Sequence, residues 1–364
     1  MPDSSQVTII FQGGLNTQNL GTGNDDGSDF LYNVTRTKAA YPQAHIILST
    51  WQSVSLPKKW ATAEQLGIDH IVRSPDPGGL PNIKFGYHAP NNVNRQIVST
   101  LAGLQVATTP YAIKLRTDSY LTSHQLLDYY QYYQQKVFTH QNKVFTHQNA
   151  DNHAQHAPTN TRPAYAPIVV PHLFTIDPNV YEHMAYHISD WAQFGTTEAL
   201  QAYWSVPLMR EADARYFEYH EHDIEASYGN DAFRTRLAVE QHIATHYANA
   251  RGFVTPAYYN QITPRILQAH QDFLARHIIV LDTAAFGLAL PKYAWAYTDE
   301  FMRLNCISHD DWYQLFCDYW QLPNPDATRL GHAQARARQK QAARRAFERA
   351  HPPKRRKILA RLYP

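Results

Sequence analysis

The sequence predicts an α/β protein in which helices flank a mostly parallel β-sheet, and three observations lead to this fold class. Short apolar runs alternate with amphipathic helical patterns through the first half of the chain. Each apolar run ends where polar loop residues begin. The 364-residue chain is 44% hydrophobic and 18% charged, which is typical of a globular protein with a sizeable core. We therefore expect one large α/β unit that carries extensions.

Four apolar runs in the first half are expected to form strands, with helices between them. The strands are predicted at Val7–Gln12, His45–Trp51, His70–Arg73 and Tyr111–Arg116. The helices are predicted at Asp29–Ala40, Pro57–Leu66 and Asn94–Gln105. Ser28 or Asp29 would cap the first helix, and Pro57 would stand near the first position of the second. Ligands of open α/β sheets bind at the carboxyl ends of the strands, so the loops after these strands should border one crevice.

The middle of the chain contains a tandem duplication. The block KVFTHQN at Lys136–Asn142 is repeated at once as Lys143–Asn149, and polar sequence continues to about Arg162. An inserted block is tolerated best at the surface, so we expect an insertion without a chemical role. The sequence then predicts a strand and several helices, at Ile168–His172, Pro178–Phe194, Thr196–Trp204, Arg234–Ala248 and Asp310–Trp320.

Basic residues are concentrated near the C-terminus. Eleven Lys and Arg residues and one acid, Glu348, lie between Arg336 and Arg361, although the formal net charge of the whole chain is only +2. The composition of residues 333–350 predicts a helix. Phe347 is the only aromatic residue between Arg336 and Lys357, whereas a nucleic-acid-binding arm would interleave aromatic residues with its charges. We expect this tail to bind an anionic membrane surface and not nucleic acid.

Cysteine usage and the N-terminus indicate where the protein works. Cys306 and Cys317 are too few for a disulfide framework, and the N-terminal residues lack the features of a signal peptide. No apolar run approaches the roughly 20 residues that span a bilayer. The expected location is cytoplasmic, with peripheral attachment at the inner face of the cytoplasmic membrane.

The stretch from Asn91 to Leu121 carries the most chemical information. It reads NNVNRQIVSTLAGLQVATTPYAIKLRTDSYL, which predicts a helix, a turn and a buried strand, and it presents Asp118 where that strand ends. A divalent cation that is held by one or two carboxylates stabilises a departing pyrophosphate. Few protein ligands suffice when phosphate oxygens complete the coordination shell. Asp118 is thus a candidate ligand for Mg²⁺ or Mn²⁺.

Seven motifs between Val7 and about Ala248 together fit one known family. They are IIFQG at Ile9–Gly13, ILSTW at Ile47–Trp51, the turn Asp76-Pro77-Gly78, the segments Asn91–Leu104 and Lys114–Leu121, HISDWAQFG at His187–Gly195, and VEQH at Val239–His242. In these motifs the chain resembles the WavE-like lipopolysaccharide-synthesis proteins, which are GT-A-type glycosyltransferases. The resemblance implies a GT-A-like, Rossmann-related fold with a helical C-terminal acceptor region and a basic helical tail. It also implies transfer of a sugar from a sugar nucleotide to lipopolysaccharide or another surface glycan.

The resemblance also divides the chain into functional segments. Residues 1–135 would form the half that binds the sugar-nucleotide donor, and residues 163–332 the acceptor half of the same domain. The duplicated insertion at 136–162 separates the two halves, and the basic tail occupies 333–364. The glycan or lipid-linked acceptor would therefore bind the part of the chain that follows the duplication.

Individual site residues follow from the family's Asp-x-Asp motif, which matches Arg116-Thr117-Asp118. Because Arg116 replaces the first Asp, Asp118 would be the sole motif ligand of the cation, and Arg116 would pair with a donor phosphate. An inverting transferase also needs a base for the acceptor hydroxyl, and Asp190 and Glu240 are both candidates. The other predicted donor-binding residues are Gln12, Gly13, Thr50, Asp76, Asn94, Arg95 and Lys114.

Two other functions stay open at this stage. Arg116 makes a catalytically silent paralogue that binds sugar nucleotides or polysaccharides credible. A sugar nucleotidyltransferase is the second alternative, but its glycine-rich signature would be followed by a basic residue, and the loop Gly13–Gly27 contains neither Lys nor Arg. The same loop lacks the G-x-G-x-x-G spacing of dinucleotide-binding folds.

A zinc site is disfavoured by the arrangement of the histidines. Two pairs, His183 with His187 and His242 with His246, have the four-residue spacing of zinc ligands on a helix. Neither pair contains the Glu of the H-E-x-x-H motif. His309 is a conceivable later ligand for the expected cation, although a capping or surface role is the simpler interpretation.

Overall fold

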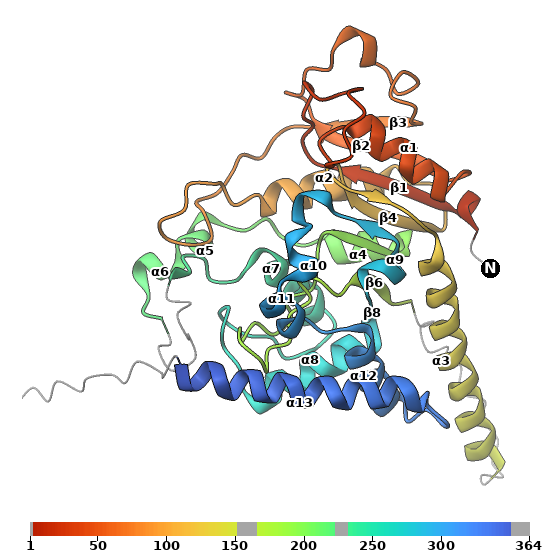
Figure 1. Ribbon diagram of the computed structural model, residues 1–364, viewed down its shortest axis with the longest axis vertical. Coiled ribbons are helices and arrows are strands. Elements are labelled where there is room, and N and C mark those ends of the chain that lie inside the picture. The colour runs from red at the N-terminus through yellow and green to blue at the C-terminus, as the bar shows by residue number, and fades with distance from the viewer. Residues whose placement is uncertain (1–2, 151–165, 223–231, 351–364) are drawn as a thin grey trace, which may run out of the picture.

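The predicted fold class is confirmed, because a mostly parallel seven-stranded sheet is flanked by helices (Figure 1). The computed structural model describes residues 3–150, 166–222 and 232–350, with the backbone alone for 139–150. The strand order is β3-β2-β1-β4-β7-β6-β8, and β7 runs antiparallel to both of its neighbours while the other pairs are parallel. The sheet therefore contains strands from both halves of the chain.

The strands are β1 (Val7–Gln12), β2 (His45–Trp51), β3 (His70–Ser74), β4 (Tyr111–Arg116), β6 (Ile168–Pro171), β7 (Ala192–Thr196) and β8 (Ile278–Leu281). A separate two-stranded sheet pairs β5 (Tyr120–Leu121) with β9 (Leu288–Ala289). The longer helices are α1 (Phe30–Ala40), α2 (Val93–Gln105), α3 (Gln125–Ala150), α4 (Thr197–Trp204), α7 (Val239–Asn249), α8 (Pro264–His277), α12 (His309–Trp320) and α13 (Ala327–Ala350). Short helices are α5 (Glu211–Ala214), α6 (Tyr216–Tyr219), α9 (Thr283–Phe286), α10 (Trp295–Thr298) and α11 (Glu300–Asn305), and short 3₁₀ turns are η1 (Ser4–Gln6), η2 (Lys58–Trp60) and η4 (Pro291–Tyr293).

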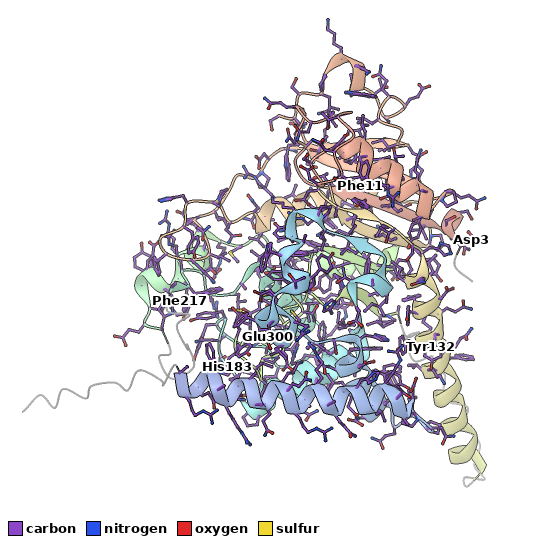
Figure 2. The ribbon with its side chains drawn as sticks, viewed as in Figure 1. Asp3, Phe11, Tyr132, His183, Phe217 and Glu300 are labelled. Atoms are coloured by element: carbon purple, nitrogen blue, oxygen red, sulfur yellow. The ribbon has the colours of Figure 1, made fainter. Side chains whose placement is uncertain are left out.

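The central strands are buried and mostly apolar because helices or loops cover both of their faces. Every residue of β1 is buried, and Figure 2 shows Phe11 within this layer. The helix α2 packs on β1, β2 and β3. A Cβ atom at Gly103 of α2 would lie only 2.4 Å from Ile10 Cγ2, so this glycine permits the close approach of helix and sheet.

Two of the helices predicted from sequence are wrong. Only η2 forms within Pro57–Leu66, where Pro57 provides no side-chain cap. Within Pro178–Phe194 the chain forms turns before β7 begins at Ala192. The imidazoles of His183 and His187 hydrogen-bond to the carbonyls of Pro178 and Phe174 there, so tertiary contacts replace a helical ladder. The helix predicted from Arg234 begins later, at Val239.

The duplicated segment and the C-terminal tail are both helical. Both copies of the repeat lie within one uninterrupted helix, α3, which runs down one side of the molecule (Figure 1). The end of the predicted insertion, 151–162, lies outside the described residues. The tail forms α13, along the side of the molecule opposite β2 and β3. Within the described ranges, no helix is both long and apolar enough to cross a membrane.

The helix α13 is bound to the body of the protein by several of its basic residues. Lys340, which is 6% exposed, forms ion pairs at 2.8 Å with both Asp177 and Asp311. Arg336 donates to Asp311 at 2.8 Å, and Arg344 donates to the carbonyl of Asn179 at 3.1 Å. These contacts reduce the part of Arg336–Arg361 that is available to an anionic surface, and residues 351–361 of that range lie outside the described chain.

Candidate functional site

The candidate site lies where the order of the strands reverses. From β1 the chain builds β2 and β3 on one side, then crosses to form β4 on the other side. Such a switch point between neighbouring strands is where open α/β sheets bind ligands. The last residues of the two strands, Gln12 and Arg116, are direct partners in the sheet. The Thr117 hydroxyl donates to the carbonyl of Gly14 at 2.6 Å, which joins the two loops.

Asp118 and Arg116 form a bidentate ion pair at this switch point. The Nε and Nη2 atoms of Arg116 donate to the two carboxylate oxygens of Asp118 at 2.8 and 2.7 Å. Their side chains are 22% and 26% exposed, so the pair reaches solvent. Burial by itself would raise the pKa of Asp118, but the guanidinium of Arg116 holds this pKa below its usual range.

The sequence motif predicts that Asp118 ligates a divalent cation, and the surroundings of this carboxylate do not fit such an ion. Both oxygens accept hydrogen bonds from Arg116, and the Lys292 ammonium lies 3.8 Å from Oδ2. Two positive groups thus surround one carboxylate, whereas Mg²⁺ and Mn²⁺ require oxygen ligands with negative charge. Among the described residues, no group of three or more His, Cys, Asp or Glu side chains is arranged to hold a metal ion. His309 instead hydrogen-bonds to Tyr133 and to the Val280 carbonyl.

Residues of η4 complete the surroundings of the pair, and sequence reasoning missed them. The Tyr293 hydroxyl accepts a hydrogen bond from Arg116 Nη2 at 3.3 Å, and its ring centroid lies 5.3 Å from the guanidinium carbon. Tyr293 also packs on Trp191, with ring centroids 4.4 Å apart. Neither Lys292 nor Tyr293 belongs to a motif, and about 175 residues separate them from Arg116, so no local signal identifies them.

The loop after β1 supports the turn at Asp118. Gly27 has a φ of +84°, and a Cβ atom there would lie 2.5 Å from the Asp118 carbonyl oxygen. Only glycine allows this approach at this backbone conformation. The buried amide of Asn33 donates to the carbonyls of Gly27 and Thr117, both at 2.9 Å. Asn33 is a further residue of the site that sequence reasoning missed.

The other predicted donor-binding residues differ in whether their side chains are free to contact a ligand. Gln12 is buried and accepts a hydrogen bond from Ser99 at 2.9 Å, and Gly13 has a φ of +122° directly after β1. The Thr50 hydroxyl is buried and has no hydrogen-bond partner within the described part of the chain. Asn94 exchanges two hydrogen bonds with the backbone of Met209, at 3.0 and 2.7 Å, so its amide has a structural role.

Asp76 and Arg95 form a second bidentate ion pair that reaches solvent. Two guanidinium nitrogens donate to the two Asp76 oxygens at 2.8 Å each, and the two side chains are 29% and 30% exposed. The hydrogen bonds from Arg95 hold the pKa of Asp76 below its usual range. A phosphate or ribose group would reach this pair only from the solvent side.

The two predicted catalytic carboxylates lie in a buried cluster with Lys114. The fully buried ammonium of Lys114 donates to the Asp190 carbonyl and lies 5.1 Å from the Trp204 ring centroid. Burial lowers the pKa of Lys114 to about 8. Asp190 is 3% exposed, and its Oδ2 has no hydrogen-bond partner among the residues described. Lys114, which was predicted to bind the donor, therefore lies behind the surface and is not exposed to a ligand.

Glu240 faces the same cluster from α7. Its Oε2 lies 3.3 Å from Nε2 of His187, which is itself buried. Burial raises the pKa of Glu240 above its usual range. A carboxyl group whose pKa is raised is suited to accept and return protons.

A cavity of about 570 Å³ is lined mostly by residues of the C-terminal half. Tyr120, two residues beyond Asp118, lines it, and so does Pro291, which precedes Lys292. Its polar lining includes His172, Asp282 and Arg303, beside leucine and alanine side chains. Asp282 is the N-cap residue of α9 but does not cap it with its side chain, which is 53% exposed. The cavity can accept a ligand that combines hydroxyl groups with apolar faces.

Comparisons with known proteins extend this description. No curated protein matches the chain. The mannosyltransferase PcManGT from Pyrobaculum calidifontis, in complex with GDP-Man and Mn²⁺, is similar at 12% identity over 96% of this chain and 76% of that chain, with a TM-score of 0.31. Residues 1–349 of S. aureus TarS, in complex with UDP-GlcNAc, are similar at 10% identity over 95% and 82% of the two chains, with a TM-score of 0.30.

A third similar structure is HddC from Yersinia pseudotuberculosis, at 10% identity over 59% of this chain and 87% of that chain, with a TM-score of 0.27. Likenesses at this level carry no argument about the site. The family comparison is of another kind, because it matches residues 7–341 to the model described as WavE lipopolysaccharide synthesis. Since that match includes the switch point, the buried cluster and the cavity, the chain belongs to the WavE lipopolysaccharide synthesis family.

Proposed function

We propose that this protein is a glycosyltransferase that transfers a sugar from a sugar nucleotide to lipopolysaccharide or another surface glycan. The observation that carries the proposal is the solvent-accessible Arg116–Asp118 pair at the switch point between β1 and β4. A planar guanidinium is suited to bind phosphate oxygens. Membership of the lipopolysaccharide synthesis family supports a surface glycan as the acceptor.

The proposed reaction is a substitution at the anomeric carbon of the donor sugar. The acceptor hydroxyl loses its proton to a carboxylate, its oxygen forms a bond to the anomeric carbon, and the bond from that carbon to the diphosphate oxygen breaks. Asp190 and Glu240 are the proposed bases, and the raised pKa of Glu240 favours this residue. Because the residues around Asp118 do not fit the divalent cation that the motif predicts, no step of the proposal depends on a metal.

The acceptor is proposed to enter from the C-terminal half, residues 163–332, and the donor from residues 1–135. The cavity beside Tyr120 supports this assignment, because most of its lining comes from the C-terminal half and Tyr120 lies two residues beyond Asp118. Sugar rings have apolar faces that pack on aromatic side chains such as Tyr120 and Tyr297. Their hydroxyl groups would donate to Asp282.

We further propose that the protein works in the cytoplasm, attached to the inner face of the membrane. Arg338, Arg345 and Arg349 of α13 are exposed. Their spacings of seven and four residues place them on one face of the helix. This face would bind anionic lipid, whereas Lys340 on another face binds the body of the protein. Such attachment would place the enzyme beside a lipid-linked acceptor.

A thermal-shift screen of sugar nucleotides, with and without Mn²⁺, tests the proposed function. A ligand that binds only the native state raises its melting temperature by mass action. We expect at least one sugar nucleotide to do so, and the failure of all of them would refute the assignment. Hydrolysis of that donor in the absence of acceptor would distinguish a transferase from a silent binding protein. Release of pyrophosphate from a nucleoside triphosphate and a sugar phosphate would instead indicate a nucleotidyltransferase.

A further inference from the structure

We propose that Arg116 and Lys292 form the binding site for the diphosphate of the donor, and that Asp118 orients Arg116 and does not ligate a cation. This inference rests on the proposed function, since it concerns how a sugar nucleotide is held. It assigns a role to Lys292, which lies outside every motif of the sequence. It also explains why a basic residue stands at the first position of the Asp-x-Asp motif.

The hydrogen-bond pattern of Arg116 leaves one edge of its guanidinium available. The Nε and Nη2 atoms bind the two oxygens of Asp118, and Nη2 also approaches the Tyr293 hydroxyl. The Nη1 atom makes no hydrogen bond with any residue that the structure describes. Two N–H groups therefore remain for phosphate oxygens. The bidentate contact with Asp118 fixes the orientation of these donors.

The ammonium of Lys292 is the second cation of the site. It lies 3.8 Å from Asp118 Oδ2, beyond hydrogen-bond distance, and its side chain is 60% exposed. The position is set by η4, because the adjacent Tyr293 packs on Trp191. Lys292 can thus direct its three N–H groups to a ligand at the surface while it stays close to Arg116.

The charges favour an anion over a cation at this position. Arg116, Lys292 and Asp118 sum to one positive charge, so a divalent cation would approach two like charges and compete with Arg116 for both carboxylate oxygens. A diphosphate group adds negative charge and leaves the Arg116–Asp118 contact intact. Fixed positive groups also stabilise the charge that develops on a departing diphosphate.

Binding of UDP, GDP and inorganic pyrophosphate, measured by calorimetry in EDTA and again in Mn²⁺, tests the inference. We expect at least one of these anions to bind with similar affinity in both buffers. Lys292→Ala should weaken this binding about tenfold, because a charge-assisted hydrogen bond is lost. Lys292→Arg should restore most of it. Lys38→Ala, which removes an exposed lysine from the last turn of α1, is the matched control and should change nothing.

Asp118→Asn separates the two roles of the carboxylate. The amide keeps one acceptor for Arg116 and removes a negative charge, so we expect the variant still to bind the anion in EDTA. Binding that requires Mn²⁺, and that is lost in Asp118→Asn but kept in Lys292→Ala, would overturn the inference and leave the proposed function intact. Absence of binding in both buffers would overturn both. Unchanged melting temperatures would show that the variants are folded.

Discussion

Trp191 packs on Tyr293 with ring centroids 4.4 Å apart and an angle of 33° between the rings. This contact joins two parts of the site, because Trp191 follows Asp190 of the buried cluster and Tyr293 holds the guanidinium of Arg116. Trp191 is 4% exposed and packs also on Phe174, so its position is fixed from both sides. The position of η4 thus depends on the core.

Two replacements of Tyr293 should distinguish the contribution of its ring from that of its hydroxyl group to sugar transfer. Tyr293→Ala removes the ring that supports both Arg116 and Trp191, and we expect kcat/KM for sugar transfer to fall about 10- to 100-fold. Tyr293→Phe keeps the ring and loses only the 3.3 Å contact with Arg116, so its loss should be less than about fivefold. Steady-state kinetics with a saturating acceptor measures both variants. Equal losses would contradict a role for stacking.

Replacement of Asp282 should weaken the binding of the acceptor and leave the binding of the donor unchanged. Its exposed carboxylate lines the cavity, and the Asp282→Asn variant keeps its size but accepts hydroxyl hydrogen bonds less strongly. We expect the KM for the acceptor to rise about tenfold while the KM for the donor stays unchanged. Gln314→Ala, which changes a residue of α12 that does not line this cavity, serves as the control. A matching rise in the KM of the donor would argue against an acceptor site.

The buried Lys114 predicts how stability depends on pH. The folded pKa is about 8, and the ordinary value is 10.5. Between these values the unfolded chain binds more protons at Lys114 than the native state, so this residue makes the free energy of unfolding increase as pH rises. The full contribution across the window is about 3 kcal/mol. Urea unfolding of wild type and Lys114→Met from pH 7 to 10.5 would test this, with the smaller increase expected in the variant.

Lys340 should anchor α13. Lys340→Met leaves Asp177 without its cation, while Asp311 keeps its contact with Arg336, and we expect about 3 kcal/mol of destabilisation. Although burial opposes it, Lys340 holds the pKa of Asp177 below its usual range, so the stabilisation is present above pH 3.8 and is lost as pH falls through the lowered value. Chemical unfolding at pH 7 and at pH 3 measures both effects. Arg338→Met, on the exposed face of the same helix, should leave stability unchanged at both pH values.

The exposed face of α13 should bind anionic lipid. The triple replacement of Arg338, Arg345 and Arg349 by Gln is expected to weaken binding to vesicles that contain phosphatidylserine by about fivefold for each residue. Sedimentation with vesicles at increasing salt concentration measures the effect. Wild-type binding should weaken as salt rises. Equal binding to neutral vesicles would contradict electrostatic attachment.

The parts of the fold that the sequence predicts well are those with local signals. The four strands of the first half were predicted within one residue, because buried parallel strands are short apolar runs. Asp118 was identified because its strand ends at a polar turn. The false helix at Pro178–Phe194 has a different cause, since contacts such as His187 with Glu240 join residues that are distant in the sequence. Propensity cannot register such contacts.

The charges that change the interpretation of the site also come from distant segments. Lys292 and Tyr293 reach Arg116 through a turn after β9, and no spacing rule connects them with the motif. The hydrogen bonds between Asn94 and Met209 could not be predicted for the same reason. Residue types indicated where a ligand binds, but the partners of each side chain, and therefore its charge environment, required the tertiary structure.

The seven-residue repeat within α3 allows this helix to change length while the same side of the helix keeps facing the body of the protein. Seven residues advance an α-helix by about 10.5 Å and turn it about 20° short of two full revolutions. Adding or deleting one copy of KVFTHQN would therefore shift the far end of α3 along its axis. Residues at equivalent positions of each repeat would still lie on nearly the same side of the helix. The length of α3 can therefore change while the sheet and its neighbours stay in place.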